Sequence, residues 1–123
     1  MKSFLTIALL VVGSAVVMCN PHDPEMRKTI EDCNKEHNVS PKDFRDFMEG
    51  KLTTVSENLK CSSHCIMVKQ GIMDEAGKFN AEMAKTKIDD DTFVAAVEAC
   101  KDLTGSTPCE TAFKITDCMI AHK

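Results

Sequence analysis

Cysteine content constrains the fold of this chain more than any other feature, because seven of its 123 residues are cysteines. Two of them lie in residues 60–66, which read KCSSHCI and also include His64. Two cysteines beside a histidine are compatible with a metal site, a redox switch or a reactive thiol, or with none of these. The rest of the sequence must decide among these alternatives.

The N-terminal segment has the three parts of a secretory signal peptide. A basic start at Lys2 precedes an apolar run that extends to Val17, and polar residues follow from Asn20. From Phe4 the run counts 14 residues, fewer than the roughly 20 that a membrane-spanning helix needs. The segment therefore predicts secretion without stable membrane insertion.

Cysteine parity favours one of two cleavage sites. Cleavage after Ala15 leaves an odd seventh cysteine in an oxidising compartment, whereas cleavage after Cys19 leaves six. We predict a signal peptide over residues 1–19 and a single domain over residues 20–123, in which the six cysteines form three disulfides.

The net charge of the predicted mature chain argues against a nucleic-acid partner. Without Lys2 this chain has 14 basic and 19 acidic residues, a net charge of −5, which makes nucleic acid an unsuitable partner.

Apolar residues recur at helical spacing, and no segment alternates apolar and polar residues for long enough to predict a strand. The pattern indicates an all-α domain of six short helices joined by short turns. The six faces are Met26, Ile30, Cys33 and His37; Phe44, Phe47 and Met48; Val55, Leu59, Ser62 and Ile66; Met83 and Ala84; Phe93, Ala96, Val97 and Cys100; and a last helix from Thr107 almost to Lys123.

Local signals place the helix ends. Ser40 is an N-cap followed by proline, and Asn80 caps the short fourth helix. The acidic residues 89–91 suit a helix start, and residues 107–110 read as a capping box with proline at the first helical position. Gly71 marks the end of the third helix.

Helix geometry excludes two of the disulfide pairings that six cysteines allow. Cys61 and Cys65 are four residues apart, so on a helix their Cβ atoms lie about 5–6 Å apart, beyond the roughly 3.5–4.5 Å of a disulfide. Cys109 and Cys118 are nine apart and lie on opposite sides of the last helix. Of the 15 arrangements, ten remain after these exclusions.

The cysteine spacing resembles that of the insect odorant-binding proteins, which include the pheromone-binding and general odorant-binding proteins. Successive gaps are 27, three, 34, eight and eight residues, and the gaps of three and eight are the most specific elements. The resemblance covers essentially the whole mature chain and implies a six-helix fold around an apolar cavity. It also implies the disulfides Cys33–Cys65, Cys61–Cys109 and Cys100–Cys118.

The other candidate sites in the sequence, for metal binding, catalysis and glycosylation, each lack a required residue or context. A zinc site at Cys61, His64 and Cys65 lacks a second ligand cluster once the cysteines pair, so we predict no metal and no cofactor. A resemblance of this segment to secreted phospholipase A2 fails because Cys65 follows the histidine and no glycine-rich calcium loop is present. Residues 89–91 lack the alternating ligands of a calcium loop. The glycosylation signal at Asn38 is followed by proline after its serine.

The family resemblance implies a secreted carrier that transports a small hydrophobic molecule, such as an odorant or a pheromone, and performs no catalysis. A chemosensory receptor and a second copy of the chain are further candidate partners. Histidines 22, 37, 64 and 122 are candidates for a loosening of the fold at acid pH. By apolarity and helix position we choose the following ligand-binding residues: Ile66, Met73, Phe79, Met83, Phe93, Val94, Val97, Phe113 and Ile120.

The alternative is a secreted, disulfide-stabilised helical interaction or defence protein without a ligand cavity. Phenylalanine and methionine are as suitable for filling a core as for lining a binding site, so composition alone does not choose between the two.

Overall fold

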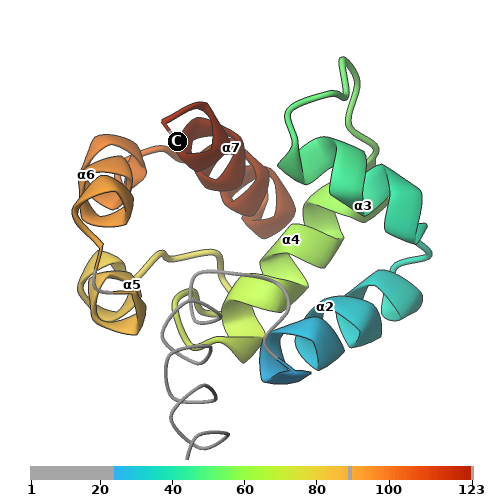
Figure 1. Ribbon diagram of the computed structural model, residues 1–123, viewed down its shortest axis with the longest axis horizontal. Helices are drawn as coiled ribbons and strands as arrows, with labels where there is room; N and C mark the ends of the chain where they lie inside the picture. The colour runs from blue at the N-terminus through green and yellow to red at the C-terminus, as the bar shows by residue number, and fades with distance from the viewer. Residues whose placement is uncertain (1–23, 89, 123) are drawn as a thin grey trace, which may run out of the picture.

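The computed structural model describes residues 24–88 and 90–122, and this part of the chain is all-α (Figure 1). The predicted signal peptide, its cleavage site, His22, Asp89 and Lys123 lie outside the described residues. The helices are α2 (Pro24–Glu36), α3 (Pro41–Met48), α4 (Glu57–Lys69), α5 (Ala81–Lys87), α6 (Asp91–Cys100) and α7 (Pro108–Ala121). The predicted set of six helices is confirmed. Within the described residues, no helix has the length and apolarity needed to cross a membrane.

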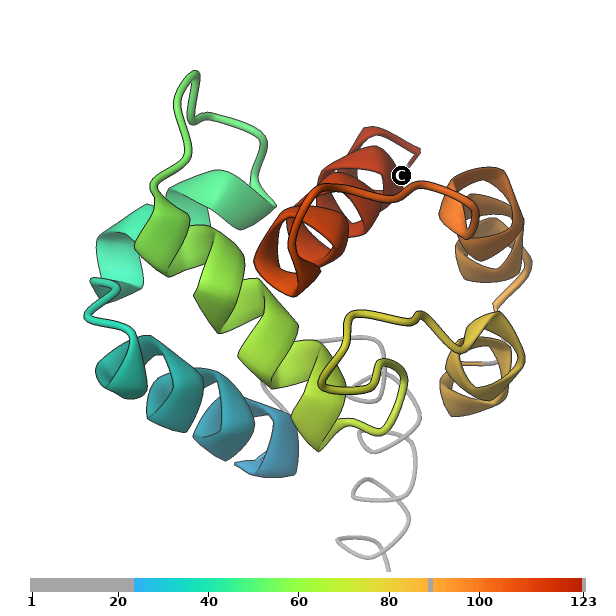
Figure 2. The ribbon, with the colours of Figure 1, turned by 180° about the vertical axis from the view of Figure 1, so that it is seen from behind.

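Helix α4 is the central element of the fold. It lies between α2 and α7, and its most extensive packing is with α7 (Figure 1). Helix α7 also packs on α6, and α6 packs on α5, whereas α3 contacts α2 (Figure 2). The segment between α4 and α5 runs from the end of α4 toward the α5–α6 pair.

Side-chain caps begin five of these helices. The predicted caps Ser40, Asn80 and Thr107 each accept a hydrogen bond from a backbone N–H three residues ahead, at 3.1, 2.9 and 3.1 Å. Within the predicted acidic start of α6, Asp90 is the cap and accepts from the N–H of Phe93 at 3.1 Å. Short polar side chains satisfy N–H groups that the first helical turn leaves without partners, which is why these positions begin helices.

Two local predictions were wrong. Val55 precedes the third helix, because Ser56 is its cap and accepts a hydrogen bond from the N–H of Leu59 at 3.2 Å. The capping box at Thr107 is half formed. Its hydroxyl accepts from the N–H of Glu110, but the Glu110 carboxylate instead lies 3.0 Å from Lys60 Nζ on α4.

Three disulfides join the helices, and they are the ones that the family resemblance implied. Cys33–Cys65 connects α2 to α4, with Cα atoms 5.7 Å apart. Cys61–Cys109 connects α4 to α7 at 4.5 Å, and Cys100–Cys118 connects α6 to α7 at 5.8 Å. All six sulfurs of these cysteines are therefore oxidised and none is a thiolate.

Residues 72–80 fold into a hairpin-like turn that places apolar side chains beside α7. Met73 and Phe79 form an antiparallel bridge, and the N–H of Asn80 donates to the carbonyl of Ile72 at 2.7 Å. Gly77 has φ +90°, and a Cβ atom there would lie 2.8 Å from the Cα of Pro108. Glycine is therefore required for this turn to approach the start of α7.

We expect the Cys61–Cys109 bridge to contribute substantially to stability, because it closes the longest loop, with a sequence separation of 48. In the chain-entropy model, the double variant Cys61→Ala/Cys109→Ala loses about 4 kcal/mol of unfolding free energy. Urea denaturation monitored by circular dichroism measures this loss. Peptide mapping of the wild type should recover three bridges and no free thiol, and a Cys61–Cys65 bridge would contradict the fold.

Candidate ligand-binding site

A buried apolar cluster is built by α4, α6, α7 and the turn that follows α4. Its buried members are Met67, Met73, Cys100, Ala112 and Ile115. Partly buried apolar side chains pack against it: Val68, Ile72, Phe79, Cys118 and Met119. Because these residues come from four separate segments, the cluster lies where the disulfide-linked elements converge.

The residues chosen from the sequence divide into three groups in the structure. Met73 and Val97 are 4% and 0% exposed, so they are packed as core. Met83 on α5 is 43% exposed. The remaining six are partly buried: Ile66, Phe79, Phe93, Val94, Phe113 and Ile120.

Within these groups, the structure brings Met73 and Phe79 together in the apolar cluster. Phe113 packs elsewhere, because its ring stacks on Phe47 of α3 with centroids 6.1 Å apart. Lys60 Nζ lies 4.8 Å from the centroid of the same ring. Phe113 is thus part of the contact among α3, α4 and α7.

Sequence reasoning missed Ala112 and Ile115, which are both fully buried on α7. A signal for them was present in the spacing from Cys118, because residues three or four apart share a helix face. Ile115 is three residues before Cys118, and Ala112 is three residues before Ile115. A half-cystine that faces another helix therefore identifies the inward face of its own helix.

Polar groups in the interior are used for structure. Ser62 Oγ donates to Asn34 Oδ1 at 2.6 Å, which joins α4 to α2 through two buried side chains. Thr111 Oγ1 accepts from the N–H of Gly105 at 2.8 Å. Within the described residues, every buried side-chain nitrogen and oxygen has a hydrogen-bond partner.

Ion pairs hold the outer helices. Glu98 on α6 pairs with Lys85 on α5 and with Lys101, whose Nζ lies 2.9 Å from the carboxylate. Hydrogen bonds from Lys85 and then Lys101 lower the pKa of Glu98 to about 2. The pKa of Lys85 is raised by hydrogen bonds to Glu82 and Glu98. This network fastens α5 to α6 on the side of the cluster remote from α3.

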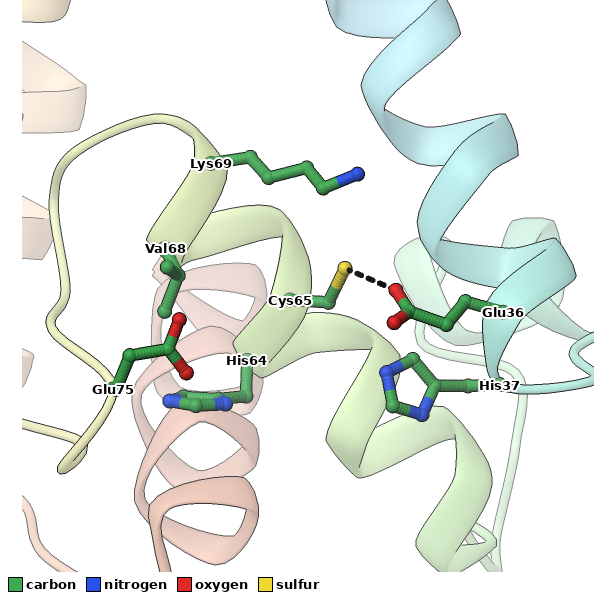
Figure 3. Close-up of a pocket in the computed structure, with 7 residues that line it drawn as sticks. All are labelled: Glu36, His37, His64, Cys65, Val68, Lys69 and Glu75. Atoms are coloured by element: carbon green, nitrogen blue, oxygen red, sulfur yellow. Dashed lines mark hydrogen bonds between the residues drawn. The ribbon is translucent and has the colours of Figure 1, made fainter.

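A surface hollow of about 320 Å³ lies between α2 and α4 and has a different character. Figure 3 shows Glu75 beside His64 and Glu36 beside His37, on opposite sides of Cys65. Glu36 Oε2 lies 3.5 Å from Cys65 Sγ, but this sulfur is in a disulfide and has no proton to donate. Val68 is the single aliphatic side chain among the seven lining residues, so the hollow suits a hydrophobic ligand less well than the apolar cluster does.

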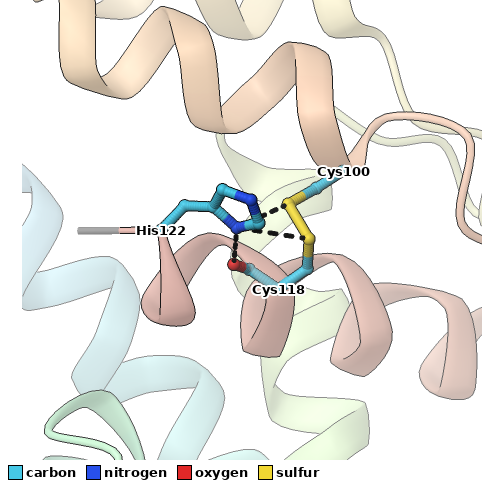
Figure 4. A group of neighbouring side chains, drawn as sticks. All are labelled: Cys100, Cys118 and His122. Carbon is cyan, nitrogen blue, oxygen red and sulfur yellow. Dashed lines mark hydrogen bonds between the residues drawn. A yellow bond between two sulfur atoms is a disulfide. The ribbon is translucent and has the colours of Figure 1, made fainter.

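The cysteines that lie near a histidine in the described part of the chain offer no thiolate to a metal, because Cys65, Cys100 and Cys118 are all in disulfides. His64 Nε2 donates to the carbonyl of Asp74 at 3.1 Å, beside the oxidised Cys65. His122 covers the Cys100–Cys118 bridge, and its Nδ1 donates to the carbonyl of Cys118 at 2.8 Å (Figure 4). The zinc alternative for Cys61, His64 and Cys65 thus loses both sulfur ligands, because zinc binds cysteine as thiolate.

Comparison with known proteins agrees with this architecture. The sequence model of the PBP/GOBP family matches residues 21–122. The chain is 26% identical over 133 residues to general odorant-binding protein 56a of Drosophila melanogaster, covering 100% of this chain and 95% of that protein. It is 32% identical over 125 residues to the B1 protein of Tenebrio molitor, covering 97% and 93%.

A solved structure has the same fold. The protein named fatty acid binding protein OBP56a, from the oral disk of the blowfly Phormia regina, superposes with a TM-score of 0.60. The match covers 78% of this chain and 86% of that one at 22% identity. At this identity the likeness establishes the arrangement of helices.

The lowered pKa of Glu98 predicts a pH-dependent contribution to stability. A depressed carboxyl pKa stabilises the folded chain fully above the ordinary value of 4.5, and this stabilisation is lost as pH falls toward about 2. Wild type should therefore have a higher Tm than Glu98→Gln at pH 7, and the difference should close between pH 4.5 and about 2.

Thermal unfolding at a series of pH values measures this difference. Glu31→Gln is the matched control, because Glu31 lies exposed on α2 and has no ion pair within the described residues. A gap between wild type and Glu98→Gln that stayed constant down to pH 2 would contradict the assignment.

Proposed function

The chain belongs to the PBP/GOBP family of odorant-binding proteins, which are non-enzymatic ligand carriers, and we propose that it binds and transports small hydrophobic molecules. The proposed site is the apolar interior formed by α4, α6, α7 and the turn over residues 72–80. Proteins of this family are secreted, and we propose secretion of this chain after removal of residues 1–19. Odorants, pheromones and similar lipophilic molecules are the proposed cargo.

The observation that carries the proposal is the set of partly buried apolar side chains on the cluster, such as Val68, Ile72 and Phe79. Surfaces of this kind gain about 25 cal/mol per Å² when a ligand removes them from water. Methionine adds an adaptable wall, because its flexible side chain fits ligands of different shapes. The disulfides support a binding role as well, since a cross-linked frame can keep open a cavity that a small core alone would close.

The relatives support the same class of ligand. The Phormia regina protein, whose fold this chain shares, is named for fatty acid binding, and a fatty acid is a small molecule with a long apolar tail. We propose by analogy that an apolar tail is the part of the cargo that this chain buries. The residues in contact with it are proposed to include Ile66, Phe79, Phe93, Val94 and Ile120, which are partly buried.

Displacement of an apolar fluorescent probe tests the carrier function. Saturable one-to-one uptake that aliphatic ligands reverse is expected, whereas no uptake would support the interaction or defence protein instead. Phe79→Ala removes an aromatic wall group and should raise the Kd about tenfold, equivalent to about 1.4 kcal/mol.

Leu103→Ala is the control, because Leu103 is 39% exposed and is not part of the cluster. It should leave the Kd within about twofold of wild type, since it removes an apolar side chain that is already hydrated. Circular dichroism of both variants checks that the fold is retained. Equal effects of the two substitutions would contradict the assignment of Phe79.

A further inference from the structure

We propose that the interior selects ligands whose head group is uncharged, such as an ester, an alcohol, an aldehyde or a protonated acid, and disfavours a carboxylate. This inference rests on the proposed carrier function and specifies its ligand class. It follows from the positions of the basic residues and the hydrogen-bonded state of the interior polar groups.

Every lysine and arginine within residues 24–88 and 90–122 is either exposed or ion-paired. Lys60 is partly buried and lies 3.0 Å from Glu110 and 4.8 Å from the Phe113 centroid. Lys85 and Lys101 are partly buried, and both pair with Glu98. The others are exposed: Arg27, Lys28, Lys35, Lys42, Arg45, Lys51, Lys69, Lys78, Lys87 and Lys114.

The partly buried cations are not free to receive a ligand carboxylate. Lys60 joins α4 to α7 through Glu110, and Lys85 joins α5 to α6 through Glu98. A carboxylate that took Lys60 would leave the partly buried Glu110 without its cation, and one that took Lys85 would compete with Glu98, which also binds Lys101. Breaking one ion pair to form another recovers little free energy.

Two interior hydroxyl groups are also engaged as hydrogen-bond donors. The buried hydroxyls of Ser62 and Ser63 donate to Asn34 Oδ1 and to the carbonyl of Leu59. His64 and His122 each donate one ring N–H to a backbone carbonyl, that of Asp74 and that of Cys118. A carboxylate entering the cluster would lose its water without gaining a charged partner, which is far more costly than burying a neutral ester.

The surrounding charge acts in the same direction. The elements that form or adjoin the cluster carry exposed acidic side chains, namely Asp74 and Glu75 after α4, Glu82 on α5 and Glu98 on α6, and the partly buried Glu110 on α7. The net charge of −4 for the whole chain adds a general repulsion of anions. In the predicted mature chain, the α-amino group of Asn20, His22 and Lys123 could also supply a cation, and all three lie outside the described residues.

A matched set of ten-carbon ligands tests the proposal. Decanoic acid, methyl decanoate and 1-decanol would each displace the fluorescent probe from the full mature protein at pH 7.5, 6.5 and 5.5. We expect the acid to bind at least tenfold more weakly than the ester at pH 7.5. Carboxyl groups have pKa values between about 4 and 5, so the ratio of the acid Kd to the ester Kd should fall up to tenfold per pH unit on acidification.

The neutral ligands correct for changes in the protein itself, since neither titrates in this range. An acid that binds as tightly as the ester at pH 7.5, or a ratio independent of pH, would overturn the charge selection alone. Failure of all three ligands to displace the probe would instead overturn the proposed carrier function.

A gain-of-function variant tests the same point without changing pH. Met119→Arg places a cation on the cluster and should lower the ratio of acid to ester Kd at pH 7.5 several-fold, while the neutral control Met119→Gln should not. An unchanged ratio in folded Met119→Arg would contradict the proposal. If this variant does not fold, the wild-type ligand series still decides.

Discussion

Helix α4 carries two half-cystines one helical turn apart, and the arrangement of the other helices depends on the disulfides that they form. Cys65 binds α2 through Cys33, and Cys61 binds α7 through Cys109. Because the two cysteines share a face, they hold α2 and α7 on neighbouring turns of one helix. The segment KCSSHCI, which has the composition of a reactive site, is therefore the structural junction of the domain.

The residues between these half-cystines complete the junction. Ser62 follows Cys61 and donates its hydroxyl proton to Asn34, which itself follows Cys33. This buried hydrogen bond fixes the same pair of helices that the first disulfide joins, and it satisfies both polar side chains. The covalent and hydrogen-bonded contacts thus specify one rotation of α4 relative to α2, which determines the side chains that α4 presents to α7.

Much of the fold was predictable from the sequence because helix starts are local. A cap and an acid lie within four residues of each other, with a proline between them after Ser40 and Thr107, so Ser40, Asn80 and Thr107 could be identified without tertiary information. One of the two errors arose where a distant residue competed. Glu110 has the position of a capping-box acid, but Lys60, 50 residues earlier in the chain, binds its carboxylate instead. The disulfide pairing was likewise non-local, and residue geometry left ten arrangements until the family resemblance chose one.

The site was less predictable than the fold, because helical spacing gives the inward face of a helix and does not give the depth of each side chain. Met73 and Met83 were chosen on the same grounds, yet Met73 is 4% exposed in a turn held by Asn80, and Met83 is 43% exposed on α5. Phe113 has the right character for a wall, but the stack with Phe47 engages it on the α3 side of α7. The burial of each side chain depends on which helices pack together, and the disulfides determine which helices do so.

Ion pairs hold adjacent helices of this small acidic domain together. The same pairs occupy lysines that a charged ligand would otherwise be able to bind. Helices α5 and α6 carry no disulfide to each other, and the contact between them is held by Lys85, Glu98 and packing. Lys60 and Glu110 make the corresponding link between α4 and α7. Each lysine used in this way is screened by a glutamate on the adjacent helix, so its charge stabilises the frame and contributes little field to the interior. Under the proposed carrier function, a wall of paired charges outside and aliphatic or aromatic groups inside would favour ligands by the apolar area they bury, and it would not compensate a charge on the ligand.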